Sequence, residues 1–243
     1  MSYRKTPLAT GEYFHVYNRG NSKQEIFLNE EDKNRFVKLL YICNSKKNVN
    51  FRDDIIEPKI NAFDFDRGET LVSIGAWVLM PNHFHLYITS PEFFSSSPKQ
   101  GLGEKKKKEE KTNITLFMHK LCTSYSKYFN KKYDRTGVLF EGKFKSVHIK
   151  DDNQAKYLFS YIHLNPVKLI DSKWKEEGIK DLDKVLEYLD IYNWSSYDDH
   201  RGILRMENKV LEVDKFPKYF SKIKDFDSEI ISWLKCDSPL SLA

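Results

Sequence analysis

The sequence predicts an α+β domain in which helices cover an antiparallel sheet. Short segments with alternating apolar residues predict strands, and longer segments with apolar residues at helical spacing predict helices. The two kinds mix along the chain without a regular β-α-β alternation, which favours an antiparallel over a parallel sheet. The 243 residues are enough to bury a core. We expect one main domain over residues 1–200 and an acidic, partly helical extension over residues 201–243.

The N-terminal third begins with a predicted strand. Residues 12–18 alternate and are rich in aromatic and β-branched side chains, as strands are. Asn29 is a suitable N-cap for a helix that runs to about residue 44. Residues 46–66 are polar and without a clear period, so we expect a loop insertion with a short strand near Phe63.

A β-hairpin is predicted next. Residues 71–79 form an almost continuous apolar run, and residues 83–89 alternate cleanly, with turn-forming Pro81 and Asn82 between them. Residues 94–112 are lysine-rich and contain Gly, Ser and Pro, which predicts a mobile linker.

The clearest predicted helix spans residues 114–131, with Thr112 or Asn113 as its cap. A helix that begins after Asp151 should stop at Pro166, because the residue before a proline avoids the α-helical region. The remaining predicted elements are a strand at 144–149, an aromatic turn at 194–197 and helices at 182–191 and within 216–234.

Composition excludes some classes of protein. No run approaches about 18 consecutive apolar residues, so no membrane span is expected. The three cysteines lack a CxxC spacing, which argues against a disulfide framework and favours a cytoplasmic protein. Residues 113–150 hold eight basic and two acidic residues interleaved with Tyr and Phe, whereas residues 171–243 carry a net charge of −4. Such a basic, aromatic stretch indicates a polyanionic partner, or else a solvated lysine-rich surface.

The first candidate for chemistry is His83-Phe84-His85. In a strand, residues two apart point to the same face, so both imidazoles project together while Phe84 faces the other way. Two neighbouring imidazoles on a rigid strand provide half of a metal site. The alternative is a pair of polar side chains on a solvated strand face.

The second candidate is the pair Tyr161 and Asn165, which lie one turn apart on a helix. Asn165 offers an amide oxygen to a hard cation and Tyr161 a phenol, unless they are only a core-edge tyrosine and a helix-ending asparagine. A divalent cation held by the two histidines and the amide would polarise a phosphodiester that the phenol attacks. No general base is evident, although His148 and His163 are near in the chain.

Five segments together resemble the single-tyrosine HUH transposases of the IS200/IS605 superfamily, and among them the REP-associated tyrosine transposases. The segments are YFHVYNRGN (13–21), WVLMPNHFHL (77–86), GVLFEGKFK (137–145), YIHLNPV (161–167) and WSSY (194–197). They occur in the family's order over about three-quarters of the chain.

The resemblance implies an antiparallel sheet of ferredoxin-like type, with a catalytic tyrosine on a flanking helix. It assigns Tyr161 as the nucleophile and His83, His85 and Asn165 as ligands of Mg²⁺ or Mn²⁺. It also implies cleavage of single-stranded DNA beside a hairpin through a 5′-phosphotyrosine, by a monomer or a homodimer. The basic residues expected to contact DNA are Arg19, Lys120, Lys127, Lys131, Lys132, Arg135, Lys143 and Lys145.

Two other functions stay open at this point. The chain could be a domesticated relative that binds DNA or RNA hairpins without turnover, although binding alone would not need all four site residues. It could also be a zinc hydrolase that uses His83 and His85 with a further ligand such as His148. An asparagine ligand suits a harder cation better than zinc.

Overall fold

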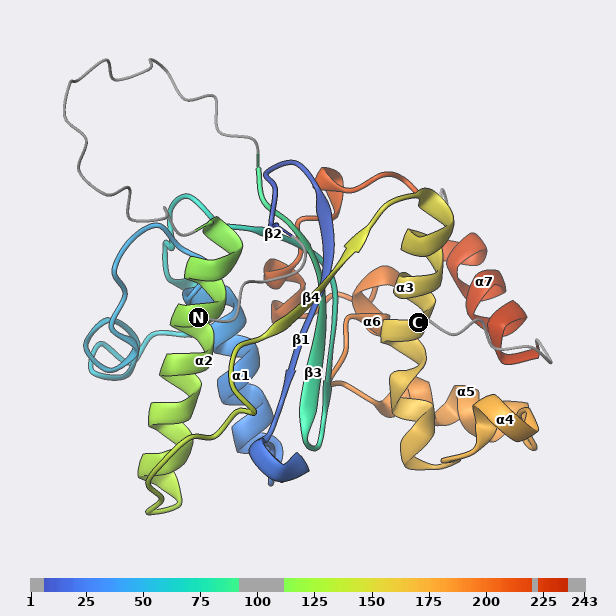
Figure 1. The fold of residues 1–243 in the computed structure, drawn as a ribbon, viewed down its shortest axis with the longest axis horizontal. Coiled ribbons are helices and arrows are strands. Elements are labelled where there is room, and N and C mark those ends of the chain that lie inside the picture. Colours follow the sequence, from blue (N-terminus) through green and yellow to red (C-terminus); the bar gives the residue numbers. More distant parts are fainter. Residues whose placement is uncertain (1–6, 92–111, 220–222, 236–243) are drawn as a thin grey trace.

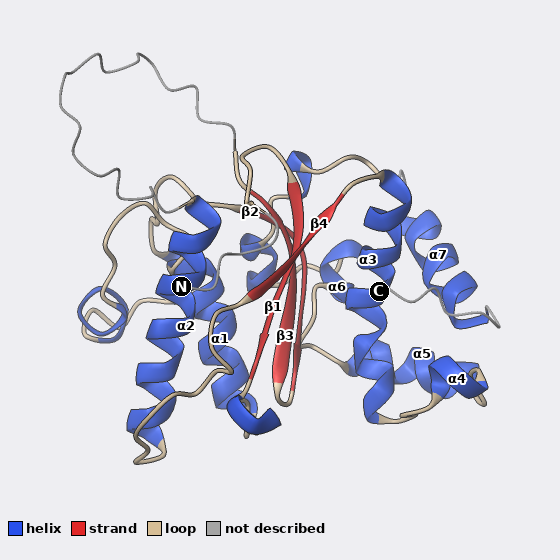
Figure 2. Ribbon diagram, viewed as in Figure 1, coloured by secondary structure: helices blue, strands red, loops and turns tan. Residues whose placement is uncertain are grey.

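The computed structural model describes residues 7–91, 112–219 and 223–235. An antiparallel sheet lies at its centre. Its four strands lie in the order β2-β3-β1-β4, with helices on both faces (Figures 1 and 2). The strands are β1 (Tyr13–Arg19), β2 (Ser73–Met80), β3 (His83–Thr89) and β4 (Lys145–Ile149). Helix α1 (Glu30–Ile42) follows β1, and α2 (Asn113–Lys132) connects β3 to β4. This β-α-β-β-α-β order is the ferredoxin-like arrangement, so the expected fold class is confirmed.

The register of the β2–β3 hairpin shows which residues lie on each face of the sheet. β3 lies between β2 and β1, and in its register His83 is opposite Arg19 of β1. Because side chains alternate along a strand, His83 and His85 share one face while Phe84 points to the other. Phe84 is fully buried in the core beneath α1 and α2, as the alternation predicts.

The first helical layer, α1 and α2, covers the Phe84 face of the sheet (Figure 1). Asn29 caps α1 by accepting a hydrogen bond from the Asp32 amide at 3.1 Å, and Thr112 caps α2 through the Thr115 amide at 3.2 Å. Both helices therefore begin where their capping residues predict.

The second layer covers the histidine face and is built around α3 (Asp152–Leu164), which continues into a 3₁₀ turn, Asn165–Leu169. It also contains α4 (Trp174–Glu177), α5 (Leu182–Ile191), α6 (Tyr197–His200) and α7 (Ile223–Lys235). Phe216, Phe226 and Ile230, from the described part of the expected extension, are buried in the same core as α3. No helix among the described residues has both the length and the apolar character needed to cross a bilayer.

Three segments differ from their local expectations or lie partly outside the described residues. Residues 62–64 form a 3₁₀ turn rather than a strand near Phe63, because the Asn61 side chain accepts the Phe63 amide at 3.0 Å and starts a turn. Pro166 ends the α-helix but not the helical path, since proline fits the first turn of the 3₁₀ segment that follows. Of the linker expected at 94–112, all but Thr112 lies outside the described residues.

The aromatic turn at 194–197 fastens α3 to the sheet. The Ser196 hydroxyl accepts the Trp77 amide of β2 at 3.0 Å and lies 2.8 Å from Nε2 of His163 on α3. Ser196 and His163 are fully buried, so neither has water as a substitute partner.

We expect Ser196→Ala to lower the free energy of unfolding by about 1–3 kcal/mol, because it leaves buried polar groups unpaired. Urea denaturation of the two proteins measures the difference, with Ser172→Ala, at an exposed position, as the control. Equal stability of Ser196→Ala and the unaltered chain would show that the turn does not fasten α3.

Candidate active site

The predicted histidine pair lies where β3, β1 and α3 meet, on the face covered by the second layer. The rings of His83 and His85 are 4.9 Å apart between centroids and nearly perpendicular. The Tyr161 ring on α3 lies 5.4 Å from His85 in an edge contact. The structure therefore brings the predicted nucleophile against His85 of the predicted histidine pair, 76 residues away along the chain.

Each histidine of the pair is held through the same ring atom. Nδ1 of His83 donates to Oδ1 of Asn82 at 2.6 Å, and Nδ1 of His85 shares a hydrogen bond of 2.8 Å with Nε2 of His15. Within the described part of the chain, no hydrogen bond engages Nε2 of either ring. The pair therefore keeps both Nε2 atoms for a ligand, as a histidine metal site requires.

Burial keeps both rings neutral. It lowers the pKa of His83 to about 4, with smaller contributions from the positive charges of Lys168 and Arg19. It also lowers the pKa of His85 well below its usual value, assisted by its histidine neighbours. Neither ring therefore carries a positive charge that would repel a cation at neutral pH.

Asn165 is the candidate third ligand and is also buried. Its Nδ2 donates to the main-chain oxygen of Tyr161 at 2.8 Å, so its carbonyl oxygen remains as the acceptor that hard cations prefer. Within the described ranges, no three His, Cys, Asp or Glu side chains converge in a group that could hold a metal ion. The Asn165 oxygen is therefore an available donor one helical turn after Tyr161, the residue whose ring contacts His85.

The two other histidines considered from the sequence lie elsewhere. His148 contacts Glu12 at 2.7 Å and packs on Phe14, on the opposite face of the sheet from the pair. It is therefore not the further ligand of a zinc site at this pair. His163 is fully buried against Ser196. Neither His148 nor His163 is therefore placed to take the Tyr161 proton.

Tyr161 lies between aromatic and cationic neighbours. The Tyr157 ring stacks on it at 6.0 Å between centroids, and Nζ of Lys175 lies 4.4 Å from its centroid. Burial raises the pKa of the Tyr161 phenol, and the Asn165 side chain partly opposes this increase. The phenol is therefore protonated at neutral pH and must lose its proton if it acts as a nucleophile.

Sequence reasoning missed two lysines of the second layer. Lys175 on α4 lies over Tyr161, and burial followed by the charge of Lys168 lowers its pKa to about 8. Lys168 is exposed, and its positive charge contributes to lowering the pKa of both histidines of the pair. Both lysines follow the YIHLNPV segment closely, but only the turn after α3 brings them back over the site.

Three of the basic residues expected to contact DNA lie near the histidine face or its edge. Arg19 is paired with His83 in the sheet and forms a two-pronged ion pair with Glu141, 2.9 Å from Nη2 to Oε1. Lys145 lies opposite Tyr17 on the edge strand β4 and is exposed, as is Lys143 in the preceding turn. Lys145 and Lys143 therefore place positive charge at the β4 edge of the sheet.

The expected contacts on and just after α2 belong to the other layer. Lys120 donates to the main-chain oxygens of Ser45 and Lys47 at 2.6 and 2.7 Å, and Lys132 pairs with the buried Asp32 at 2.8 Å. Arg135 donates to Gln24 at 3.0 Å, whereas Lys127 and Lys131 are exposed. The structure therefore does not bring this group together with the histidine pair.

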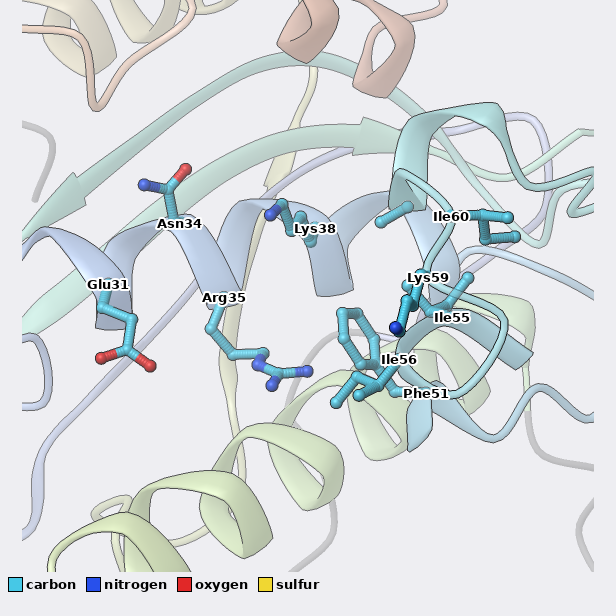
Figure 3. Close-up of a pocket in the computed structure, with 10 residues that line it drawn as sticks. Glu31, Asn34, Arg35, Lys38, Phe51, Ile55, Ile56, Lys59 and Ile60 are labelled. Atoms are coloured by element: carbon cyan, nitrogen blue, oxygen red, sulfur yellow. The ribbon is translucent and has the colours of Figure 1, made fainter. Parts of the chain in front are cut away.

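A surface hollow lies in the first layer beside α1 (Figure 3). The guanidinium of Arg35 lies 4.0 Å from the centroid of Phe51 there, and Lys38 and Lys59 also line the hollow. Because α1 packs on the Phe84 face, this hollow is not part of the histidine site.

Among solved structures, the chain is similar to a REP-associated tyrosine transposase bound to a REP hairpin. The match has a TM-score of 0.46 and 16% sequence identity, and covers 85% of this chain and 90% of that chain. At this identity the likeness concerns the fold alone. No protein-family model matches the sequence, and no curated protein was found to be similar to it.

Proposed function

We propose that the protein is a metal-dependent endonuclease and strand transferase of single-stranded DNA that cleaves beside a hairpin. The observation that carries the proposal is the contact of the Tyr161 ring with His85. The hydrogen bonds of His83 and His85 engage Nδ1 of each ring, so the Nε2 atoms face a cation site in this proposal. His83, His85 and Asn165 would hold Mg²⁺ or Mn²⁺, which when bound polarises the scissile phosphate.

The remaining chemistry is assigned to the chain's own residues. The Tyr161 oxygen forms a bond to phosphorus while the bond from phosphorus to the 3′-oxygen breaks. The phenol proton passes through solvent to the leaving 3′-oxygen, so the products are a 5′-phosphotyrosine and a free 3′-hydroxyl. Strand transfer is the reverse attack by a 3′-hydroxyl, which releases Tyr161.

Lys168 and Lys175 are proposed to attract the phosphate that Tyr161 attacks. Both charges act on the same small region, and Lys175 lies directly over the nucleophile's ring. We expect Lys175→Met to slow cleavage by about 10²-fold, since one removed donor at developing charge costs that much. Lys175→Arg should retain more activity because it keeps the positive charge.

Single-turnover cleavage rates measure the effect of Lys175, and the exposed Lys127→Met on α2 is the matched control. A Lys175→Met protein that cleaves as fast as the unaltered chain would remove Lys175 from the proposal.

The function itself is tested with single-stranded DNA from the flanks of the protein's own gene, including any hairpin. A label on the 3′ end of the DNA follows the strand that would become attached to the protein. With Mn²⁺, we expect a labelled protein band on a denaturing gel, and EDTA should remove it. Unchanged DNA that is still retarded on a native gel would indicate a binding protein without turnover. Cleaved ends without an adduct would indicate hydrolysis by water.

A further inference from the structure

The hydrogen bonds behind the histidine pair determine which ring nitrogen carries the proton. An amide oxygen only accepts, so the contact of Asn82 with His83 places the His83 proton on Nδ1. The amide orientation is itself fixed, because Nδ2 of Asn82 donates to the main-chain oxygen of Lys23 at 3.1 Å. The backbone of Asn82 is anchored too, since its oxygen accepts the Gly20 amide at 2.8 Å.

His15 holds the equivalent place behind His85. Both side chains are 5% exposed, and their rings stack at 4.9 Å between centroids. One proton lies between Nε2 of His15 and Nδ1 of His85. If His15 donates it, Nε2 of neutral His85 carries a proton and cannot bind a cation. If His85 donates it, Nε2 of His85 is free, as Nε2 of His83 is.

We propose that Asn82 and His15 are positioning residues for a metal at the histidine pair. Each accepts the Nδ1 proton of one histidine, and each thereby presents that histidine's Nε2 to the cation. The inference rests on the metal dependence of the proposed function. To that function it adds two hydrogen-bond acceptors behind the metal ligands, His15 on β1 and Asn82 in the β2–β3 turn.

The tautomers are measured directly by long-range ¹H–¹⁵N correlation spectra of the metal-free full-length protein. We expect His83, His85 and His15 all to carry their proton on Nδ1. Assignment uses the His15→Gln and His148→Gln proteins. A His85 ring with its proton on Nε2 in the unaltered chain would overturn the proposal without any reference to activity.

Metal affinity provides the second measurement, by Mn²⁺ titration followed by electron paramagnetic resonance. We expect His15→Leu and Asn82→Ala to bind Mn²⁺ about 10–100-fold more weakly than the unaltered chain, the usual cost of losing an outer-shell partner. His15→Gln and Asn82→Asp keep an accepting oxygen and should recover part of the loss. His148→Gln, on the opposite face, should bind normally.

The two proposals fail in different ways. An unaltered chain that binds Mn²⁺ but forms no DNA adduct would contradict the proposed function and leave the tautomer result standing. An active chain whose His15→Leu and Asn82→Ala variants are folded and bind Mn²⁺ unchanged would contradict the positioning role. Should His15→Leu not fold, the spectra of the unaltered chain and the Gln variant still decide the matter.

Discussion

Replacing Tyr161 by Phe is expected to abolish the covalent protein–DNA adduct and to lower strand cleavage by about 10⁴-fold or more, as removal of a nucleophile does. The ring remains, so the contacts with His85 and Lys175 persist and only the attacking oxygen is lost. Binding of Mn²⁺ and of hairpin DNA should be retained. Denaturing gels report the adduct, and electron paramagnetic resonance reports the metal.

Tyr17 provides the matched control for this prediction. Its ring lies 5.6 Å from His85, almost as close as that of Tyr161, but on strand β1 rather than on a helix. We expect Tyr17→Phe to cleave DNA at a rate of the same order as the unaltered chain. An adduct that persists in Tyr161→Phe and disappears in Tyr17→Phe would show that Tyr17 on β1, and not Tyr161, is the nucleophile.

The second large effect is a loss of stability in mild acid. Burial lowers the pKa of His15 to about 3 and those of His83 and His200 to about 4, and it also lowers those of His85 and His163. In the unfolded chain these groups take up protons near pH 6.5. The stability they contribute is therefore complete above about pH 6.5 and is lost as the pH falls towards 4.

Each such histidine steepens the pH dependence by about 1.4 kcal/mol per pH unit. With five acting together, we expect the free energy of unfolding to fall by several kcal/mol between pH 6.5 and 5. Urea denaturation at a series of pH values measures it.

His200→Gln, which keeps a donor for the Gly75 oxygen, serves as the control because it lies away from the histidine pair. It should lower the slope by about one proton. A free energy of unfolding that stays constant from pH 7 to 5 would contradict the neutral, buried state of these rings.

The parts of the fold that sequence could predict are those set by local periodicity. The alternation of residues 83–89 alone places His83 and His85 on one face and Phe84 in the core, and the structure agrees. Asn29, Thr112 and Asp151 mark helix starts because each side chain accepts a hydrogen bond from an amide in the first turn.

The site was predictable only in part, because its remaining members meet through long-range contacts. His15 lies 70 residues from His85, and nothing in its strand pattern shows which neighbour it faces. Lys175 reaches Tyr161 only through the turns that follow α3. Conversely, local charge predicted Lys120 and Lys132 as DNA contacts. In the fold, Lys120 donates to a main-chain oxygen and Lys132 pairs with the carboxylate of Asp32.

The proposed function requires that Tyr161 becomes covalently attached to DNA, and mass spectrometry of the trapped adduct detects this attachment. After reaction with Mn²⁺, the protein is digested with a nuclease and a protease, and peptides that carry a nucleotide are sequenced. We expect one modified tyrosine, Tyr161, bearing a 5′-nucleotide. A nucleotide on any other residue, or none on a protein that still cleaves DNA, would contradict it.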